Sequence, residues 1–325
     1  MILPSEDVKE FKPAPTVASF SARGPGGLTE SVLKPDLMAP GVSILAAAMP
    51  STDKADVPAG RKPSAFAIKS GTSMACPHVA GASAFFKSAH PGWSPSMIRS
   101  ALMTTGINVP KSVFNQSSHK AKQLDRLGFA CLTKTTLPAA TTTNNLGKPV
   151  ASSTGAVATG HDMGAGEISP LRALSPGLVF DTTTKDYLNF LCYYGYKAKL
   201  VRMVSGDTGF ACPHGAPSQD LIATGLNYPS ISVPRLASGK PVAVSRTAMN
   251  VGPSNATYQA SVEAPLGLSV KVSPELLVFS KRWASAAYQV TFARAAGVSK
   301  GYAYGAVTWS DGAHSVRTSF AVNVV

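Results

Sequence analysis

Gly71-Thr72-Ser73-Met74-Ala75-Cys76-Pro77-His78-Val79-Ala80-Gly81 is the most informative run in this sequence of 325 residues. Residues 74–89 have helical composition, with small side chains that let a helix approach a neighbouring sheet closely. The run His90-Pro91-Gly92 predicts the end of that helix. A short strand is expected at 65–68 and a turn at 70–72. Ser73 is therefore predicted to lie in the first turn of a helix that follows a strand.

A second helix is predicted from Pro95 to about Thr104. Ser94 is suited to cap it, and Pro95 is tolerated at the first helical position because its missing N–H needs no partner there. Residues 13–105 thus combine short apolar strands with helices. By contrast, residues 106–160 are rich in Thr, Ser, Asn and Ala without apolar periodicity, which predicts a loop.

Strand-like runs recur every ten to fifteen residues beyond about residue 225, a spacing that favours a β-sandwich. Asp311-Gly312 predicts a two-residue hairpin turn, because Gly accepts the positive φ of a type I′ turn. The expected strands are 230–233, 242–246, 258–263, 268–272, 288–292, 306–309 and 316–325.

Composition restricts the class of protein. With 44% hydrophobic and 14% charged residues the chain is expected to be globular, with two domains as the simplest arrangement. No stretch approaches the roughly 18 apolar residues of a membrane span, so no membrane association is expected. The formal charge of +13 invites a nucleic-acid interpretation. Lys and Arg occur singly or in pairs without interleaved aromatic residues, so we expect diffuse surface charge and no nucleic-acid partner.

The predicted position of Ser73 suits acyl transfer. Free backbone N–H groups and the positive end of the helix dipole lie beside a hydroxyl in the first helical turn. A serine that attacks a carbonyl generates a tetrahedral oxyanion, which the N–H of Ser73 is placed to stabilise. Serine is also an ordinary residue at helix starts, so position alone leaves a structural role open. This chemistry requires no metal or cofactor, and none is expected.

The run from Gly71 to Gly81 resembles the signature around the nucleophile of subtilisin-like serine proteases, the subtilases, and its Cys-Pro-His is similar to the plant branch. The resemblance extends over nearly the whole chain. Glu167 stands where the family often has His. Further matching runs are Ser19–Pro25, Leu33–Val42, Gly164–Pro170, Pro176–Asp181, Asp186–Leu188, Leu191-Cys192, Leu226–Ile231 and Trp309–Gly312.

The resemblance implies that Ser73 is the nucleophile of a Ser-His-Asp triad that cleaves peptide bonds through an acyl-enzyme. In this family the triad Asp and His, and the Asn of the oxyanion hole, all precede the serine. No histidine precedes Ser73 here. His78 lies about 140° further round the helix and is interpreted as a packing residue, and Asp36 as a loop-organising carboxylate. We therefore expect this polypeptide alone to be inactive, as a C-terminal fragment or truncated gene model.

By the same resemblance the expected fold is α/β. Residues 1–12 would be a remnant of a protease-associated insertion. Residues 13–183 would be the C-terminal part of a parallel-sheet catalytic domain, 184–224 a connector, and 225–325 a fibronectin-III-like sandwich. Residues 106–139 interrupt the family pattern, and codons for Gly106 and for Ala139-Ala140 can supply splice sites. We hypothesise that this stretch is a translated retained intron.

The cysteines are too few for a disulfide framework. Cys76 is expected to be a buried free thiol, and Cys131 falls in the anomalous stretch. Cys192 and Cys212 match positions that pair in the plant family, so the resemblance implies a disulfide there. Asn255-Ala256-Thr257 is an N-glycosylation sequence. Both features fit a secreted parent, in the apoplast or cell wall, although the chain itself starts without a signal-peptide pattern.

Two other functions remain possible at this point. The chain could be a non-catalytic pseudoprotease that binds peptides or proteins. It could also be an α/β-hydrolase, because Gly71-Thr72-Ser73-Met74-Ala75 nearly fits G-x-S-x-G. Ala75 at the final glycine and Pro77 early in the helix count against the latter. A protein or peptide substrate is the expected partner, with no prediction of specificity or oligomeric state.

Overall fold

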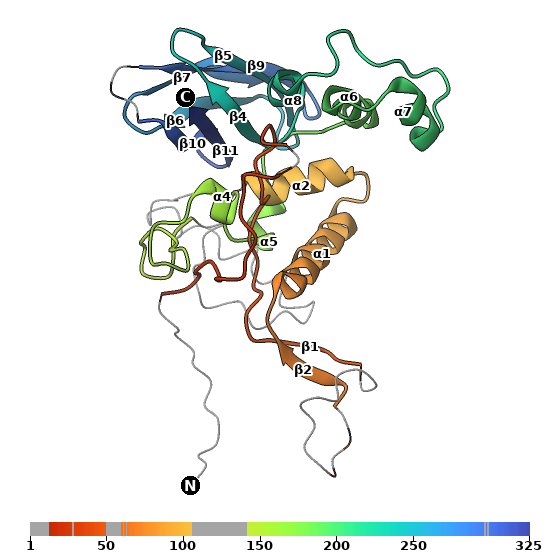
Figure 1. Ribbon diagram of the computed structural model, residues 1–325, viewed down its shortest axis with the longest axis vertical. Helices are drawn as coiled ribbons and strands as arrows, with labels where there is room; N and C mark the ends of the chain where they lie inside the picture. Colours follow the sequence, from red (N-terminus) through yellow and green to blue (C-terminus); the bar gives the residue numbers. More distant parts are fainter. Residues whose placement is uncertain are drawn as a thin grey trace.

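Two β-sheets form the C-terminal part of the protein, and a helical region packs beside them (Figure 1). The computed structural model describes residues 13–27, 29–49, 60, 62, 64–105, 142–295, 297 and 299–325. The expected insertion remnant at 1–12 and the anomalous stretch at 106–139 lie outside the described residues.

The two sheets have five and four strands. Within the described residues of these sheets, β4 and β11 pair in parallel and the other neighbouring strands pair antiparallel. The first sheet has the order β4 (Ser230–Leu236), β11 (Ser315–Val324), β10 (Gly301–Ser310), β6 (Ala256–Glu263) and β8 (Leu276–Phe279). The second has the order β3 (Leu178–Val179), β5 (Val242–Asn250), β9 (Ser285–Arg294) and β7 (Leu268–Ser273). The strands expected beyond residue 225 are confirmed, while β3 and β8 were not predicted.

Aromatic side chains from both sheets meet in the sandwich core. Tyr288 and Trp309 contact edge to face with ring centroids 5.0 Å apart, and Phe292 contacts Phe320 at 5.2 Å. All four are buried. Such pairs add to the hydrophobic effect of burying large rings. Alternating inward residues along β5 and β9 are thus what fixes the register of the second sheet.

The predicted two-residue hairpin at Asp311-Gly312 is wrong. Ser310 pairs with Ser315, so the connection between β10 and β11 has four residues, 311–314. Gly312 does adopt a positive φ of 86°. The turn is longer because the Asp311 carboxylate accepts the backbone N–H groups of Ala313 and His314, which closes a wider loop than the two-residue turn.

Helices α1 (Thr72–Ala89) and α2 (Pro95–Thr104) confirm the two predicted helices. The Ser94 hydroxyl accepts the N–H of Met97 at 3.1 Å, as a cap should, and α1 ends at His90. Most of α2 is buried, and α2 contacts both β11 and β3. The helices and the sandwich therefore share packed interior, with short α4 (Gly160–Met163) and α5 (Pro170–Ala173) between them in sequence.

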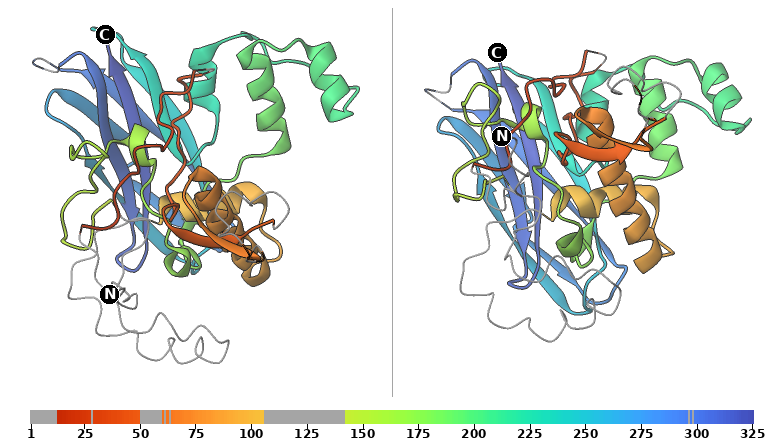
Figure 2. Two further views of the ribbon diagram at one scale, coloured as in Figure 1. Left: turned by 60° about the horizontal axis from the view of Figure 1, so that its bottom comes forward. Right: turned by 90° about the horizontal axis from the view of Figure 1, so that it is seen from below.

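The strands described before α1 are β1 (Ile44–Ala47) and β2 (Phe66–Lys69), and they pair antiparallel. Isolated parallel bridges join Thr16 to Ala151 and Met38 to Glu167. A parallel sheet was expected within residues 13–183, but the described part of that range has the antiparallel hairpin β1–β2 and these isolated bridges. Figure 1 shows the hairpin β1–β2 beyond the N-terminal end of α1 and away from the sandwich, and Figure 2 gives two further views of this arrangement.

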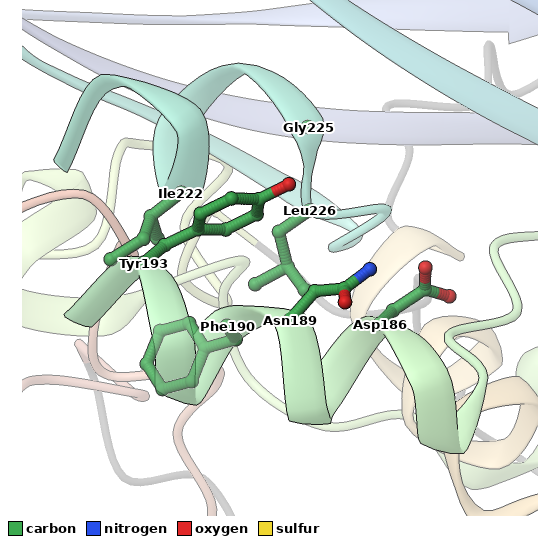
Figure 3. A pocket seen from close by; sticks show the side chains of 7 residues that line it. All are labelled: Asp186, Asn189, Phe190, Tyr193, Ile222, Gly225 and Leu226. Carbon is green, nitrogen blue, oxygen red and sulfur yellow. The ribbon is translucent and has the colours of Figure 1, made fainter. Parts of the chain in front are cut away.

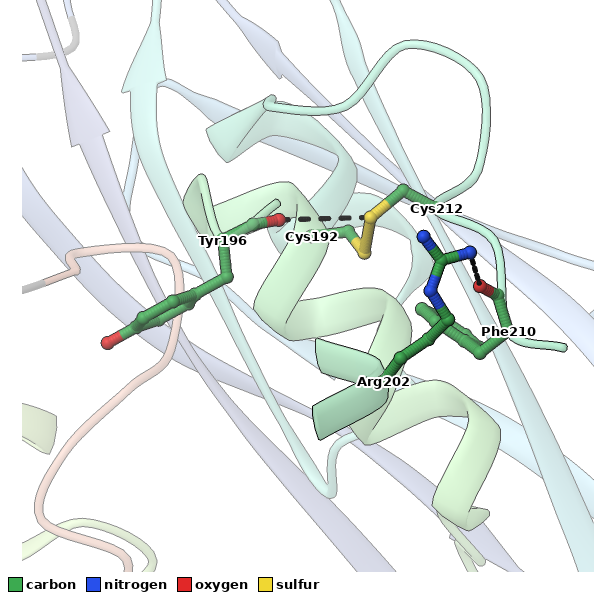
Figure 4. Close-up of a disulfide and its surroundings, with 5 residues drawn as sticks. All are labelled: Cys192, Tyr196, Arg202, Phe210 and Cys212. Carbon is green, nitrogen blue, oxygen red and sulfur yellow. Dashed lines mark hydrogen bonds between the residues drawn. A yellow bond between two sulfur atoms is a disulfide. The ribbon is translucent and has the colours of Figure 1, made fainter. Parts of the chain in front are cut away.

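Residues 184–224, which were predicted to form a connector, contain α6 (Thr184–Tyr194), α7 (Ala198–Ser205) and most of α8 (Gln219–Gly225). A disulfide joins Cys192 in α6 to Cys212 after α7, which confirms the pairing that the resemblance implied (Figure 4). Arg202 of α7 donates to the carbonyl of Phe210 at 3.3 Å, on the same loop (Figure 4). The loop is thereby fixed to both helices. A small pocket between α6 and α8 is lined by Phe190, Tyr193 and Leu226, among others (Figure 3).

Candidate active site

Ser73 is the second residue of α1, and it is exposed. The helix follows Gly71, whose carbonyl accepts the N–H of Met74 at 3.0 Å. No acidic residue occupies the first turn, so nothing there offsets the partial positive charge of the N-terminus. The placement predicted for Ser73, in the first turn of a helix that follows a strand, is thus what the structure shows.

The segment 41–43 lies directly against the first turn of α1. Gly71 donates its N–H to the carbonyl of Gly41 at 2.8 Å, and the N–H of Ser43 donates to the Ser70 hydroxyl at 2.8 Å. A Cβ on Gly41 would stand 2.9 Å from the Gly71 oxygen and 3.3 Å from Ala75 Cβ. Only a glycine permits this approach, which holds the strand-to-helix turn before Ser73 in place.

The hairpin β1–β2 presents apolar side chains to solvent near this turn. Leu45 pairs with Ile68 across the hairpin, and the two are 70% and 73% exposed. Phe66, on the same face, is 61% exposed. Exposed apolar side chains that share one face indicate a surface that binds something, because isolated monomers rarely leave such faces open.

The prediction that Cys76 is buried is wrong. Cys76 is a free and exposed thiol. The physical reason is that α1 buries only Ala82 and Phe86 fully, both in its C-terminal half. The face with Cys76 meets no covering element among the described residues.

No described histidine forms a hydrogen bond with the Ser73 hydroxyl. His78 is exposed and its Nδ1 lies 2.8 Å from the carbonyl oxygen of Met74, as expected of a residue pointing away from Ser73. His90 stacks on Trp93, and its Nε2 lies 3.0 Å from the Leu174 carbonyl. Within the described chain the Ser73 hydroxyl has no hydrogen-bond partner. No base for it is therefore found in the part of the chain that the structure describes.

Asp36 organises a loop, as predicted. Its carboxylate accepts hydrogen bonds from Lys34 Nζ at 2.8 Å and from the Tyr228 hydroxyl at 2.5 Å. Burial raises the pKa of Tyr228, and the Asp36 carboxylate raises it further. Gly164 makes this possible, since a Cβ there would stand 2.4 Å from the Pro35 oxygen. Asp36 thus fixes the 33–38 segment to the sandwich side of the molecule.

Burial shifts the pKa values of two further groups, His161 and Glu167. His161 is buried, with Nδ1 2.9 Å from the Tyr304 hydroxyl, and burial lowers its pKa despite Asp162 and Glu30, which raise it. Burial likewise raises the pKa of Glu167. Both groups favour their neutral forms in the folded protein.

Ser175, His314 and Asp311 lie close together in an arrangement that the sequence did not predict. His314 Nε2 lies 3.4 Å from the Ser175 hydroxyl, and its Nδ1 lies 2.8 Å from Asp311 Oδ2. Only the spacing Asp311-Gly312-Ala313-His314 in a hairpin loop could have suggested part of it, because Ser175 is 139 residues away.

Residues 7–146 match the family described as "Subtilase family", and residues 225–322 match "Fibronectin type-III domain". The chain is similar to the CO(2)-response secreted protease of Arabidopsis thaliana, with 41% identity over 99% of this chain and 37% of the relative. It is 38% identical to subtilisin-like protease SBT5.1 of Arabidopsis thaliana over 99% of this chain and 37% of that protein. Subtilisin-like protease Glyma18g48580 of Glycine max is 37% identical over 96% of this chain and 35% of that protein.

The chain therefore spans little more than a third of the length of these curated relatives. A PapD-like domain of human CEP192 covers 30% of this chain and 80% of its own with 14% identity and a TM-score of 0.24, too low to bear on the fold. No described helix has the length and apolarity needed to cross a membrane. Residues 7–146 are thus similar to the subtilase family and residues 225–322 to the fibronectin type-III domain, and over nearly its whole length the chain is similar to plant proteases named as subtilisin-like.

Proposed function

We propose that the chain is the nucleophile-bearing part of a subtilisin-type serine endopeptidase, with Ser73 as the catalytic nucleophile. The observation that carries this proposal is the exposed Ser73 hydroxyl at the N-terminal turn of α1, within a region that matches the subtilase family. That match favours a subtilase over an α/β-hydrolase. The apolar face of β1–β2 beside the turn supports a peptide or protein as the substrate.

In the proposed reaction the Ser73 Oγ attacks the scissile carbonyl and forms an acyl-enzyme while the amine departs. The Ser73 N–H, which lies in the first turn, stabilises the oxyanion that forms. The proton of the hydroxyl must pass to a base, because an unassisted serine is a weak nucleophile. The family supplies that base from a histidine upstream of the serine, and no histidine precedes Ser73 in this sequence.

We therefore propose that this polypeptide alone has no measurable peptidase activity. In this proposal residues 13–183 belong to a parallel-sheet catalytic domain whose remaining strands come from upstream sequence in the relatives. Residues 184–224 form the connector and 225–325 the fibronectin-III-like sandwich. The parent protein is secreted, as the name of one relative states for that protein and as the disulfide favours here.

The test compares cleavage of fluorogenic peptides by this chain, by its Ser73→Ala variant, and by a chimera. The chimera joins the upstream part of the Arabidopsis CO(2)-response secreted protease to this chain. We expect background rates from the chain and its variant, and cleavage by the chimera that Ser73→Ala abolishes. Cleavage by the chain alone that requires Ser73 would refute the inactivity, and a chimera insensitive to Ser73→Ala would refute the role of Ser73.

A second candidate function is binding without catalysis. The exposed apolar face of Leu45, Phe66 and Ile68 favours it, because that surface needs no catalytic base to hold a peptide. Peptide binding to this chain would then survive Ser73→Ala and weaken when Leu45 and Ile68 are replaced by Ser. Fluorescence anisotropy with a labelled peptide library separates the two functions.

A further inference from the structure

Ser175, His314 and Asp311 form a connected set at the junction of the helical region and the sandwich. Ser175 follows α5 and is exposed, whereas His314 and Asp311 belong to the loop between β10 and β11. The side chains of His314 and Asp311 are 15% and 13% exposed. The acid and the base are thus largely shielded from water, while the serine is exposed to reagents in solution.

The acid of the set is held in its ionised form. Burial by itself raises the pKa of Asp311, but hydrogen bonds from the backbone and ring of His314 and from the N–H of Ala313 outweigh it, and the pKa is lowered. The Asp311 Oδ2 carboxylate oxygen lies 2.8 Å from His314 Nδ1. This pairing keeps the proton of a neutral imidazole on Nδ1, so that Nε2 offers its lone pair to Ser175.

The backbone around Gly177 brings the imidazole to the serine. Gly177 has φ +78°, and a Cβ there would stand 2.7 Å from His314 Cβ and 2.6 Å from the Tyr258 hydroxyl. His314 therefore packs directly over the Gly177 backbone, two residues from Ser175. The separation of 3.4 Å between Ser175 Oγ and His314 Nε2 is at the outer limit of a hydrogen bond, as is common for such pairs without substrate.

We propose that Ser175 is a second nucleophilic serine, independent of Ser73, that accepts acyl or phosphonyl groups from small activated donors with His314 as its general base. In the acyl reaction the Ser175 Oγ–H bond breaks, its proton passes to His314 Nε2, and Oγ bonds to the carbonyl carbon of an ester. The carbon–oxygen bond to the leaving group then breaks, and that alcohol or phenol departs with the proton from Nε2. Water then gives a proton to His314 Nε2 and attacks the acyl carbon, the bond from that carbon to Ser175 Oγ breaks, and the proton returns to Oγ as a carboxylic acid is released.

Activated esters and phosphonyl fluorides are the class to which the geometry points. Ser175 lies at an open surface, so the donor must be small and must react without a deep binding pocket. Its leaving group must depart readily, because an amide needs far more stabilisation of the developing charge. With a fluorophosphonate the Oγ–P bond forms, the P–F bond breaks, and fluoride leaves with the proton held by His314.

The experiment treats the full chain with a fluorophosphonate probe and locates the adduct by mass spectrometry after trypsin digestion. Ser175 lies in the peptide 173–185 and Ser73 in the peptide 70–87, so the two sites are distinguished directly. We expect the adduct on Ser175. His314→Gln is expected to slow that labelling on the order of 10²-fold, because the serine then lacks its general base.

Matched controls separate reactivity from folding. His78→Gln replaces an exposed histidine whose ring contacts only a backbone carbonyl, and Ser238→Ala replaces an exposed serine, so both are expected to leave labelling unchanged. Circular dichroism melts show whether His314→Gln and Ser175→Ala remain folded. If His314→Gln unfolds, the labelling of Ser175 relative to other exposed serines in the unaltered chain still decides. No adduct on Ser175, equal labelling of other exposed serines, or an unchanged labelling rate in a folded His314→Gln variant would each overturn the proposal.

Discussion

Replacing Cys192 and Cys212 together by Ala removes the bridge between α6 and the loop after α7. The bridge closes a separation of 20 residues, for which the loop-entropy relation gives about 11 cal/mol/K, or about 3.3 kcal/mol at 25 °C. Because α7 contacts mainly α6 in the described chain, the loss should fall on the connector. We expect the opening free energy of α7 to drop by that amount, while the sandwich keeps its own.

Hydrogen exchange of backbone amides measures this directly. The N–H of Gly206, which donates to the Arg202 carbonyl at 2.9 Å, reports on the end of α7. A loss of about 3.3 kcal/mol corresponds to exchange on the order of 10²-fold faster. Exchange in β9 of the sandwich serves as an internal reference, because the bridge does not constrain it.

Two controls make the result interpretable. Cys192 is buried beside Val201 and Phe210, so its truncation also leaves a small cavity, and reducing the unaltered chain isolates the loss of the cross-link from that effect. Cys76→Ala, at an exposed free thiol, should change nothing. Amide exchange in α7 that speeds up less than 3-fold on reduction would refute the reasoning that loop closure stabilises the connector.

Three further predictions concern buried ionisable groups, each checked by thermal or urea unfolding. His161→Phe keeps a ring against Tyr304 but removes the titrating group. Because burial lowers the pKa of His161, the unfolded chain binds the proton before the folded chain as the pH falls below about 6.5, which destabilises the unaltered protein. The Tm of the variant minus that of the unaltered chain should therefore rise as the pH is lowered from about 7.5 to about 5, and a constant difference would contradict this. Glu167→Gln removes a carboxyl whose pKa is raised by burial, so the variant should be more stable than the unaltered chain at pH 7. Below about pH 4 this gain should disappear, because the carboxyl is then protonated in both the folded and the unfolded state. A gain that persists at that pH would exclude titration as its cause. Arg246→Met should lower the free energy of unfolding by about 2–4 kcal/mol. The buried guanidinium, whose pKa burial lowers to about 10, donates to the backbone carbonyls of Tyr228 and Ser230 at 3.0 and 3.1 Å. A loss under about 1 kcal/mol would show that water replaces these hydrogen bonds.

Local signals in the sequence located the elements whose ends are set by their own residues. Ser94 and Pro95 predicted the start of α2 because a cap and an N-terminal proline act within one helical turn. The strands beyond residue 225 followed from alternation and turn spacing. The two-residue β3 and the four-residue β8 escaped because such short runs carry no period of their own.

Features that depend on distant residues could not be predicted. The exposure of Cys76 depends on what covers α1, and helical composition alone indicated a buried helix. The contact between Ser175 and His314 joins residues 139 apart, and only the folded loop of Asp311 brings them together. Ser73, by contrast, was placed correctly because its position depends on Gly71 and the turn beside it.

The strand β3 alters where this protein can be divided. The fibronectin type-III match begins at residue 225, yet Leu178 and Phe180, far upstream of it, are buried in the sandwich core, and β3 hydrogen-bonds along β5. A sandwich that starts at residue 225 would lack the strand that pairs with the edge of β5 and would lose two side chains from its core. A sandwich module that is moved into another protein must therefore start before Leu178 and include residues 184–224.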